Sequence, residues 1–179
     1  APFIELLLRD ETFYVMWMNL YSAFKSHHFC LICAFEKEGY RMHPNHEIPI
    51  WQRSQAIPAM EIGIIQSTRA VESALGKPGK KEIKRKFERV LNRWKNTVNI
   101  DPNSEFLLGN KSYIDYYYEL FRIRGDAAHS LGSFPYELRR KNAIKAQCFA
   151  FEIMSSYFRK NKISLNESCE KINLNEQFI

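Results

Sequence analysis

The sequence contains few of the residues that make turns. Only 7 of its 179 residues are glycine and 7 are proline, and so few turn residues favour long helices over many short strands. We find no alternating strand pattern, no internal repeat and no low-complexity segment. Apolar residues make up 45% of the chain, enough for one domain with a sizeable core. The expected fold class is all-α, a bundle of about five or six helices.

Cysteine and long apolar runs are also scarce. The four cysteines are too sparse for a disulfide framework in a chain of this length. No stretch has the pattern of a signal peptide, and no apolar run of about 20 residues is flanked by Lys or Arg. These absences predict a protein of the reducing cytoplasm with no membrane partner.

The chain divides into three expected regions. Residues 1–55 contain two apolar runs, Phe13–Phe24 and Phe29–Phe35, on either side of a short polar stretch. They predict an N-terminal helical hairpin and loop packed on the bundle, with one buried helix as the alternative to the hairpin. Residues 56–162 are expected to form the bundle, and residues 163–179 a polar C-terminal tail that is either loose or a short helix.

Capping and stop residues mark the expected ends of the helices. These residues are Asp10 or Thr12 as one N-terminal cap, Pro58 in a first turn, Gly76 as a stop, Ser112 with Asp115 as a capping box, and Tyr136 and Arg159 as the limits of the last helix.

Residues 80–98 predict a strongly basic helix. The formal net charge of the chain is +6, which is compatible with a polyanionic partner, and the cations of this helix have a spacing that suits a phosphate backbone. Trp94 recurs with the apolar residues of the helix, so core packing is favoured over stacking on a base. The candidate RNA-binding residues are Lys84 and Arg85 here, Arg139 and Arg140 at the start of the last helix, and Arg122.

The densest chemistry lies in the stretch FRIRGDAAHSLG, which contains Arg122, Arg124, Asp126 and His129. Histidine titrates near neutral pH and transfers protons, and arginine is a permanent forked donor for a phosphate. RNA supplies its own nucleophile, the 2′-hydroxyl, which DNA lacks. An arginine and a histidine together therefore have the chemistry to cleave RNA without a metal.

Helical geometry separates these residues into two pairs. Arg122 and Asp126 have the i,i+4 spacing of an ordinary ion pair, and His129 suits the end of a helix, where its cation favours the helix dipole. Arg124 and His129 are five residues apart, about 140° around a straight helix. They converge only if the helix loosens near Gly125 or if a second copy of the chain supplies the partner residue.

This stretch resembles the signature of the HEPN superfamily (higher eukaryote and prokaryote nucleotide-binding domains), all-α domains that carry Arg, four to six residues, and then His. Arg124 and His129 have four residues between them. The aromatic helix before them is most similar to the Apea-like branch. Residues 67–76 (STRAVESALG) resemble an earlier helix of that branch, and the resemblance covers residues 57–160.

The resemblance implies a HEPN-like helical bundle and a metal-independent endoribonuclease without a cofactor. It implies a homodimer with a shared RNA-cleaving site, serving as a toxin or an anti-phage defence component, with an antitoxin or other protein as a further partner. Carried over, His129 is the acid/base, Arg124 the phosphate clamp, and Asp126 completes the catalytic set. The family often has Asn, Asp or His directly after the arginine, where this chain has Gly125. The alternative is therefore a non-catalytic helical module that binds RNA or a protein.

A second group of residues has the composition of a zinc site. Cys30-x-x-Cys33 and His43-x-x-His46 offer two sulfurs and two imidazoles, which suit tetrahedral zinc. The cysteines lie in an apolar run, where buried free thiols are common, and the spacing differs from that of zinc fingers. Core cysteines and loop histidines are the favoured interpretation, and a zinc-stabilised interaction domain is a third hypothesis.

Overall fold

The computed structural model describes the backbone of residues 2–35, 50–129 and 136–175, and the side chains of residues 2–26, 57–129 and 138–161. The described chain is helical almost throughout, which confirms the all-α prediction. Its helices are α1 (Pro2–Arg9), α2 (Glu11–Phe35), α3 (Ile50–Leu75), α4 (Lys84–Thr97), α5 (Tyr113–His129) and α6 (Tyr136–Asn175). None of these helices combines the length and the apolar content that crossing a membrane requires.

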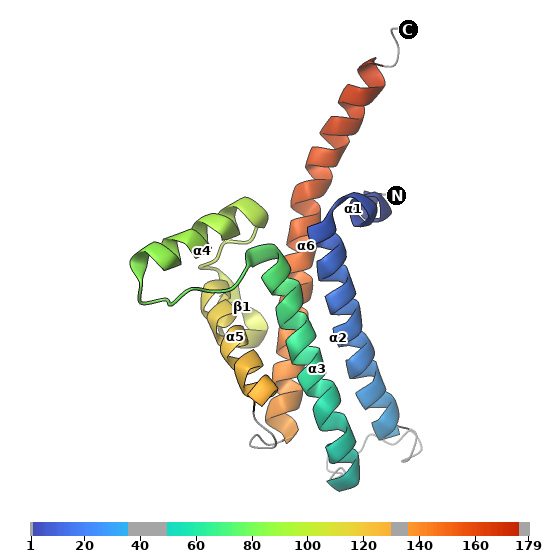
Figure 1. Ribbon diagram of the computed structural model, residues 1–179, viewed down its shortest axis with the longest axis vertical. Helices are drawn as coiled ribbons and strands as arrows, with labels where there is room; N and C mark the ends of the chain where they lie inside the picture. Colours follow the sequence, from blue (N-terminus) through green and yellow to red (C-terminus); the bar gives the residue numbers. More distant parts are fainter. Residues whose placement is uncertain (1, 36–49, 130–135, 176–179) are drawn as a thin grey trace.

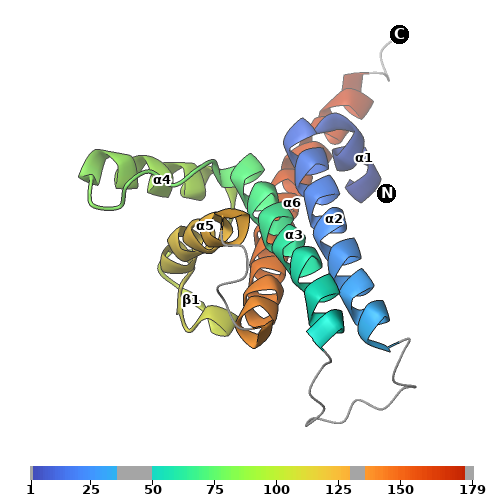
Figure 2. The same cartoon turned by 60° about the horizontal axis from the view of Figure 1, so that its bottom comes forward.

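Three long helices form the body of the molecule. Helices α2, α3 and α6 run side by side, with α3 in contact with both of its neighbours (Figure 1). Helix α5 packs against α3 on the side away from α2, and α1 folds back against α2 and α6. Helix α4 projects sideways from this body, as both views show (Figure 2). It therefore exposes most of its circumference.

A small β-hairpin precedes α5. Strands β1 (Glu105–Phe106) and β2 (Lys111–Ser112) pair antiparallel around a 3-10 turn at Leu107–Gly109. The sequence shows no strand pattern at this position, because two residues are too few to alternate visibly. The hairpin positions Phe106, which is buried and packs at 4.7 Å between ring centroids on Tyr116.

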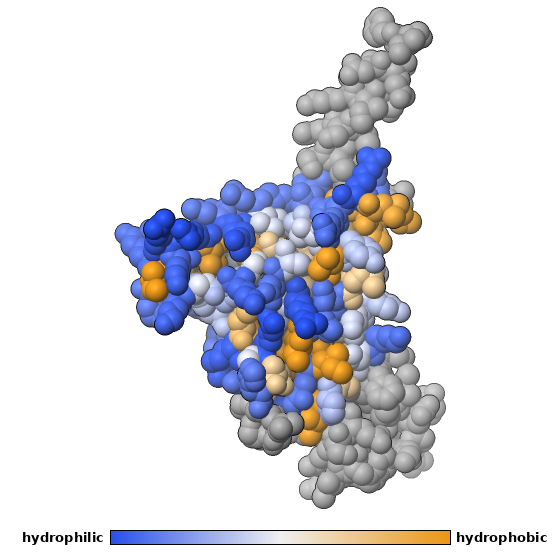
Figure 3. Space-filling view, in the orientation of Figure 1, coloured by the Kyte–Doolittle hydropathy of each residue, from blue (hydrophilic) through white to orange (hydrophobic). Residues whose placement is uncertain are grey.

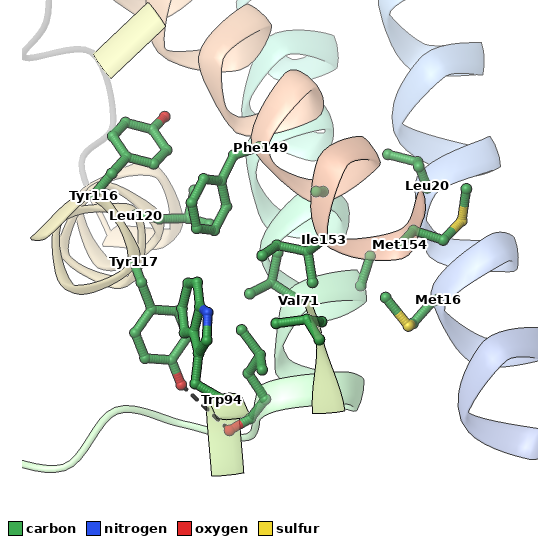
Figure 4. Close-up of a cluster of buried hydrophobic side chains, with 14 of the residues drawn as sticks. Met16, Leu20, Val71, Trp94, Tyr116, Tyr117, Leu120, Phe149, Ile153 and Met154 are labelled. Carbon is green, nitrogen blue, oxygen red and sulfur yellow. Dashed lines mark hydrogen bonds between the residues drawn. The ribbon is translucent and has the colours of Figure 1, made fainter. Parts of the chain in front are cut away.

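The core is built around aromatic side chains from α4, α5 and α6. Trp94, Tyr117 and Phe149 are fully buried, with ring centroids of Trp94 and Tyr117 5.7 Å apart in an edge-on arrangement (Figure 4). The indole Nε1 of Trp94 donates to the carbonyl oxygen of Ile100 at 2.8 Å, so its polar atom is satisfied. This confirms that Trp94 is a core residue.

The predicted helix stop at Gly76 is confirmed. Helix α3 ends at Leu75, and Gly76 follows in the left-handed conformation with φ of 72°, which glycine adopts without a steric penalty. The Arg93 guanidinium of α4 donates to the Leu75 carbonyl at 2.9 Å, and the Tyr117 hydroxyl of α5 donates to the Gly76 carbonyl at 2.5 Å. The end of α3 thus joins three helices.

Two predicted caps are present. The Phe13 amide donates to the Asp10 carboxylate at 2.9 Å, which identifies Asp10 as the cap of α2. The Asp115 amide donates to the Ser112 hydroxyl at 3.2 Å, as expected of a capping box at the start of α5. Both signals are local, because the capping atom lies three residues from its partner.

Three predicted boundaries are wrong. Of the two alternatives for residues 1–55, the helical hairpin is wrong and a single helix across both apolar runs agrees with the structure, because α2 continues through Lys25–His28 to Phe35. Residues 11–35 contain no glycine or proline, and the Ser26 hydroxyl donates to the Ser22 carbonyl of the same helix at 2.9 Å. From the sequence alone, a polar stretch inside a helix therefore looks the same as a turn between two helices.

The other two errors concern helices that are longer than predicted. Helix α3 begins at Ile50, so Pro58 lies inside it and not in its first turn. Helix α6 continues from Tyr136 to Asn175, through most of the region expected to be a tail, and its end extends past the other helices in Figure 1. Polar residues dominate residues 163–175, so composition alone predicts a loose tail or a short helix there.

Replacing Gly76 and Gly125 with alanine is predicted to change stability in opposite directions. At Gly76 a Cβ would have to adopt a left-handed φ and would lie 1.7 Å from Arg93 Nη1, so Gly76→Ala should lower the free energy of unfolding by about 2 kcal/mol. At Gly125, inside α5, a Cβ meets no atom within 4 Å, so Gly125→Ala should raise it by ~0.5–1 kcal/mol. Urea unfolding measures both. Destabilisation by Gly125→Ala would show that α5 needs a glycine there.

Candidate functional site

The arginine–histidine stretch occupies the C-terminal part of α5, which runs without a break to His129. Gly125 lies inside this helix at a helical φ and does not interrupt it. The loosening near Gly125 that would bring Arg124 towards His129 is therefore absent. On a continuous helix the two side chains point about 140° apart, so a single chain does not place them around one phosphate.

Arg124 is held by a residue from α3. Its Nη1 donates to Glu72 Oε2 at 2.6 Å, and the side chains of Arg124 and Glu72 are 26% and 24% exposed. The other carboxylate oxygen, Glu72 Oε1, lies 3.5 Å from Lys77 Nζ. Glu72 belongs to the segment 67–76, so the structure brings together the two segments on which the family resemblance depends. The charge of Arg124 is already balanced within the chain.

Arg122 and Asp126 form the i,i+4 ion pair that the spacing predicts. Arg122 Nη1 lies 3.5 Å from Asp126 Oδ2, and 69% of the Arg122 side chain is exposed. A pair so open to solvent contributes little to stability. Asp126 therefore lies beside Arg122.

His129 is the last residue of α5 and is exposed to solvent. The negative end of the helix dipole stabilises a positive charge at this position. Exposure also leaves the ring open to an external group, which a general acid or base requires. In one chain His129 is available, and no ion pair joins it to another residue in the described ranges 57–129 and 138–161.

Helix α4 carries a basic face on its exposed side. Of its residues only Val90 and Trp94 are buried, and hydrophilic side chains cover the projecting part of the molecule (Figure 3). The exposed cations in the first two turns of α4 are Lys84, Arg85, Lys86 and Arg89, and none of them forms an ion pair with a residue that the structure describes. Unpaired cations on one projecting helix suit a polyanion.

One ion pair anchors the start of this basic region to α5. Lys81 Nζ donates a hydrogen bond to Asp115 Oδ1. This bond has the largest effect in lowering the pKa of the Asp115 carboxyl, and the hydrogen bond from the Ser112 hydroxyl has the second largest. Asp115 thus joins the cap of α5 to the segment before α4. Lys84, the next lysine along the chain, is the first residue of α4 and the first cation of its basic face.

Arg139 and Arg140 do not continue that face as expected. Arg139 is only 4% exposed, and its Nη1 donates to Glu61 Oε1 of α3 at 2.5 Å. Arg140 is half-buried. Sequence analysis missed Glu61 and Glu72 altogether, because each lies more than 50 residues from its arginine and carries no local signal.

The proposed zinc ligands fall outside the described part of the structure. Residues His43 and His46, and the side chains of Cys30 and Cys33, are among those that the structure does not describe. Elsewhere, within the described residues, no group of three or more His, Cys, Asp or Glu side chains is close enough together to hold a metal. Burial raises the pKa of the Cys148 thiol, so this cysteine is less reactive than a free thiol.

A double-mutant cycle on Glu72→Gln and Arg124→Gln is predicted to give a coupling energy of about 1–2 kcal/mol in urea unfolding, because both side chains are largely shielded and share a charge-assisted hydrogen bond. The matched cycle on Arg122→Gln and Asp126→Asn should give less than ~0.5 kcal/mol. Equal coupling energies in the two cycles would show that Glu72 does not hold Arg124 in solution.

Comparisons with known proteins add no assignment to this geometry. No protein-family model matches the chain, and no curated protein or solved structure matches it either. What the chain does is therefore inferred from the described residues: an open basic helix, a paired arginine and an exposed histidine.

Proposed function

We propose that this chain binds RNA along the basic face of α4. The observation that carries this proposal is the row of exposed cations on α4, from Lys84 to Arg89, that have no carboxylate partner among the described residues. Charges left without internal partners on a projecting helix are free to neutralise phosphates and release counterions. The same helix is fixed to the body by Val90 and Trp94, so its cations are presented on a rigid support.

RNA is favoured over DNA by the residues at the end of α5. Arg124 and His129 have the chemistry for a reaction that needs a 2′-hydroxyl, which only RNA provides. Single-stranded RNA is the form we expect, because the rings beside the cations of α4, Phe87 and Tyr118, are partly exposed and pack on each other, so unpaired bases can stack there without sequence readout. Binding should therefore depend on the backbone and on salt more than on sequence.

Replacing Lys84 and Arg85 together with glutamine should weaken RNA binding and reduce its salt dependence. Each phosphate contact on single-stranded RNA contributes about −0.7 to the slope of log K against log salt. Loss of two contacts should therefore reduce the magnitude of the slope by roughly 1.4. Fluorescence anisotropy with a labelled single-stranded RNA at several chloride concentrations measures the change.

Arg9→Gln with Lys25→Gln provides the matched control. These substitutions remove the same charge from exposed positions on α1 and α2, on the opposite side of the body from α4 in Figure 1. They should leave the slope nearly unchanged. If both double variants lose the same amount of slope, the effect depends only on the net charge of the protein, which would contradict a binding face on α4. Binding of DNA of the same sequence at equal affinity would contradict the preference for RNA.

A second candidate function is metal-independent RNA cleavage of the HEPN type, which would suit a toxin or an anti-phage defence component. The observation that favours it is the separation of Arg124 and His129 on a continuous α5, with His129 open to solvent. Two copies packed at the ends of their α5 helices would pair Arg124 of one with the histidine of the other. The homodimer is thus part of this proposal.

The reaction would use His129 as the proton carrier and Arg124 as the clamp. The imidazole takes the proton of the 2′-hydroxyl, the 2′-oxygen forms a bond to phosphorus, and the bond from phosphorus to the 5′-oxygen breaks as that oxygen is protonated. Arg124 stabilises the charge that develops on the phosphate oxygens. For this, Arg124 has to exchange Glu72 for the phosphate, so Glu72 competes with the substrate for the same guanidinium.

Mixing two inactive variants tests this shared site. Arg124→Ala and His129→Ala should each abolish cleavage of RNA in EDTA, as measured on a denaturing gel. A mixture of the two should recover about a quarter of the parent activity, since half of the dimers then contain one intact composite site. Loss in both variants without recovery in the mixture contradicts a shared site. A parent that binds RNA and does not cut it removes this second candidate and leaves the binding function.

A further inference from the structure

A cleft of about 110 Å³ lies between α3, α5 and α6. It is separate from the basic face of α4, because none of its lining residues belongs to that helix. Its polar lining consists of Glu61, Glu119, Arg122, Asp126, Arg139 and Asn142. Ile64, Ile123 and Ala127 supply apolar walls, so a ligand there would be partly removed from water.

Arg139 is the residue whose bonding is incomplete. Only 4% of its side chain is exposed, and of its three nitrogens only Nη1 has a partner among the described residues, Glu61 Oε1. Its Nε and Nη2 are shielded from water and have no hydrogen-bond acceptor among the described residues. Leaving such groups unpaired costs roughly 1–3 kcal/mol each, and more when they are charged. These two nitrogens form one edge of the guanidinium, which matches the two oxygens of a carboxylate or a phosphate.

The charges around the cleft favour an anionic ligand over a cationic one. Each carboxylate in the lining already has a basic partner: Glu61 has Arg139, Glu119 has Lys111 at 2.6 Å, and Asp126 has Arg122. Within the described part of the chain, the guanidinium edge formed by Nε and Nη2 of Arg139 has no acceptor. A metal ion or an organic cation would therefore compete with basic side chains that already pair with these carboxylates, whereas an oxyanion would provide the acceptor that the edge of Arg139 lacks.

The position of Arg139 adds to this preference. It is the fourth residue of α6, whose first turn presents the positive end of a helix dipole to the cleft region. Asn142, one turn later, also lines the cleft and has an amide that can donate to a ligand oxygen. The nearby carboxylates of Glu61, Glu119 and Asp126 disfavour a second negative charge.

We infer that this cleft binds a singly charged oxyanion, a carboxylate or a phosphodiester, on the free edge of Arg139. The ligand enters past Arg122, whose side chain is 69% exposed and forms the movable rim of the cleft. The inference does not depend on RNA binding by α4 or on cleavage by Arg124 and His129.

Nuclear magnetic resonance of the arginine Nε–H groups tests the site in the full chain. Sodium acetate and dimethyl phosphate are titrated separately against sodium chloride at constant ionic strength. The Arg139 Nε–H signal should shift and saturate, with a Kd on the order of 1 mM. Saturation by acetate alone identifies a carboxylate site, by dimethyl phosphate alone a phosphodiester site, and by both a general oxyanion site. No saturable shift with either ligand overturns the proposal.

Three variants separate a binding role of Arg139 from a structural one. Arg139→Lys keeps the positive charge but removes the guanidinium edge, so it should abolish saturable binding. Lys141→Gln removes a full positive charge two residues away at an exposed position, and it should leave binding unchanged. If Arg139→Lys does not fold, Glu61→Gln decides the matter. Removing this neighbouring negative charge should tighten binding of the anion severalfold. Unchanged or weaker binding in Glu61→Gln would show that Arg139 serves only its ion pair.

Discussion

The last carbonyl oxygens of α3 need donors that the helix itself does not supply, and two other helices provide them. Arg93 of α4 donates to Leu75, and Tyr117 of α5 donates to Gly76. Gly76 makes both contacts possible, because its left-handed turn ends α3 and leaves room for the Arg93 guanidinium. The packing of Trp94 on Tyr117 buries the same junction (Figure 4). The directions of α4 and α5 are fixed at this point.

The functional features follow from that junction. With α4 held at its buried Val90 and Trp94, the basic side chains on the rest of its circumference face solvent. With α5 held at Tyr117, its later turns lie along α3, where Glu72 reaches Arg124. His129, at the end of α5, lies beyond these contacts and remains exposed. One junction therefore leaves a free cationic face, a neutralised arginine and an accessible histidine in the same chain.

Features with a local cause were predictable from the sequence, and features that depend on distant partners were not. The stop at Gly76, the caps at Asp10 and Ser112, and the burial of Trp94 each follow from neighbouring residues. The pairing of Arg124 with Glu72 joins residues 52 apart, and the burial of Arg139 depends on Glu61, 78 residues away. Such pairings arise only when α3 packs against α5 and α6. The sequence left the continuity of α2 open for a different reason, since polar residues between two apolar runs fit either a turn or a continuing helix.

The central claim is that α4 is the face on which RNA lies. The most direct measurement is an amide NMR titration of the full chain with single-stranded RNA at low salt. The account predicts that the largest shifts occur in Lys84–Thr97, with smaller ones near His129, and that they fade as chloride is raised. Shifts centred on α1 and α2, or shifts that persist in high salt, would contradict it.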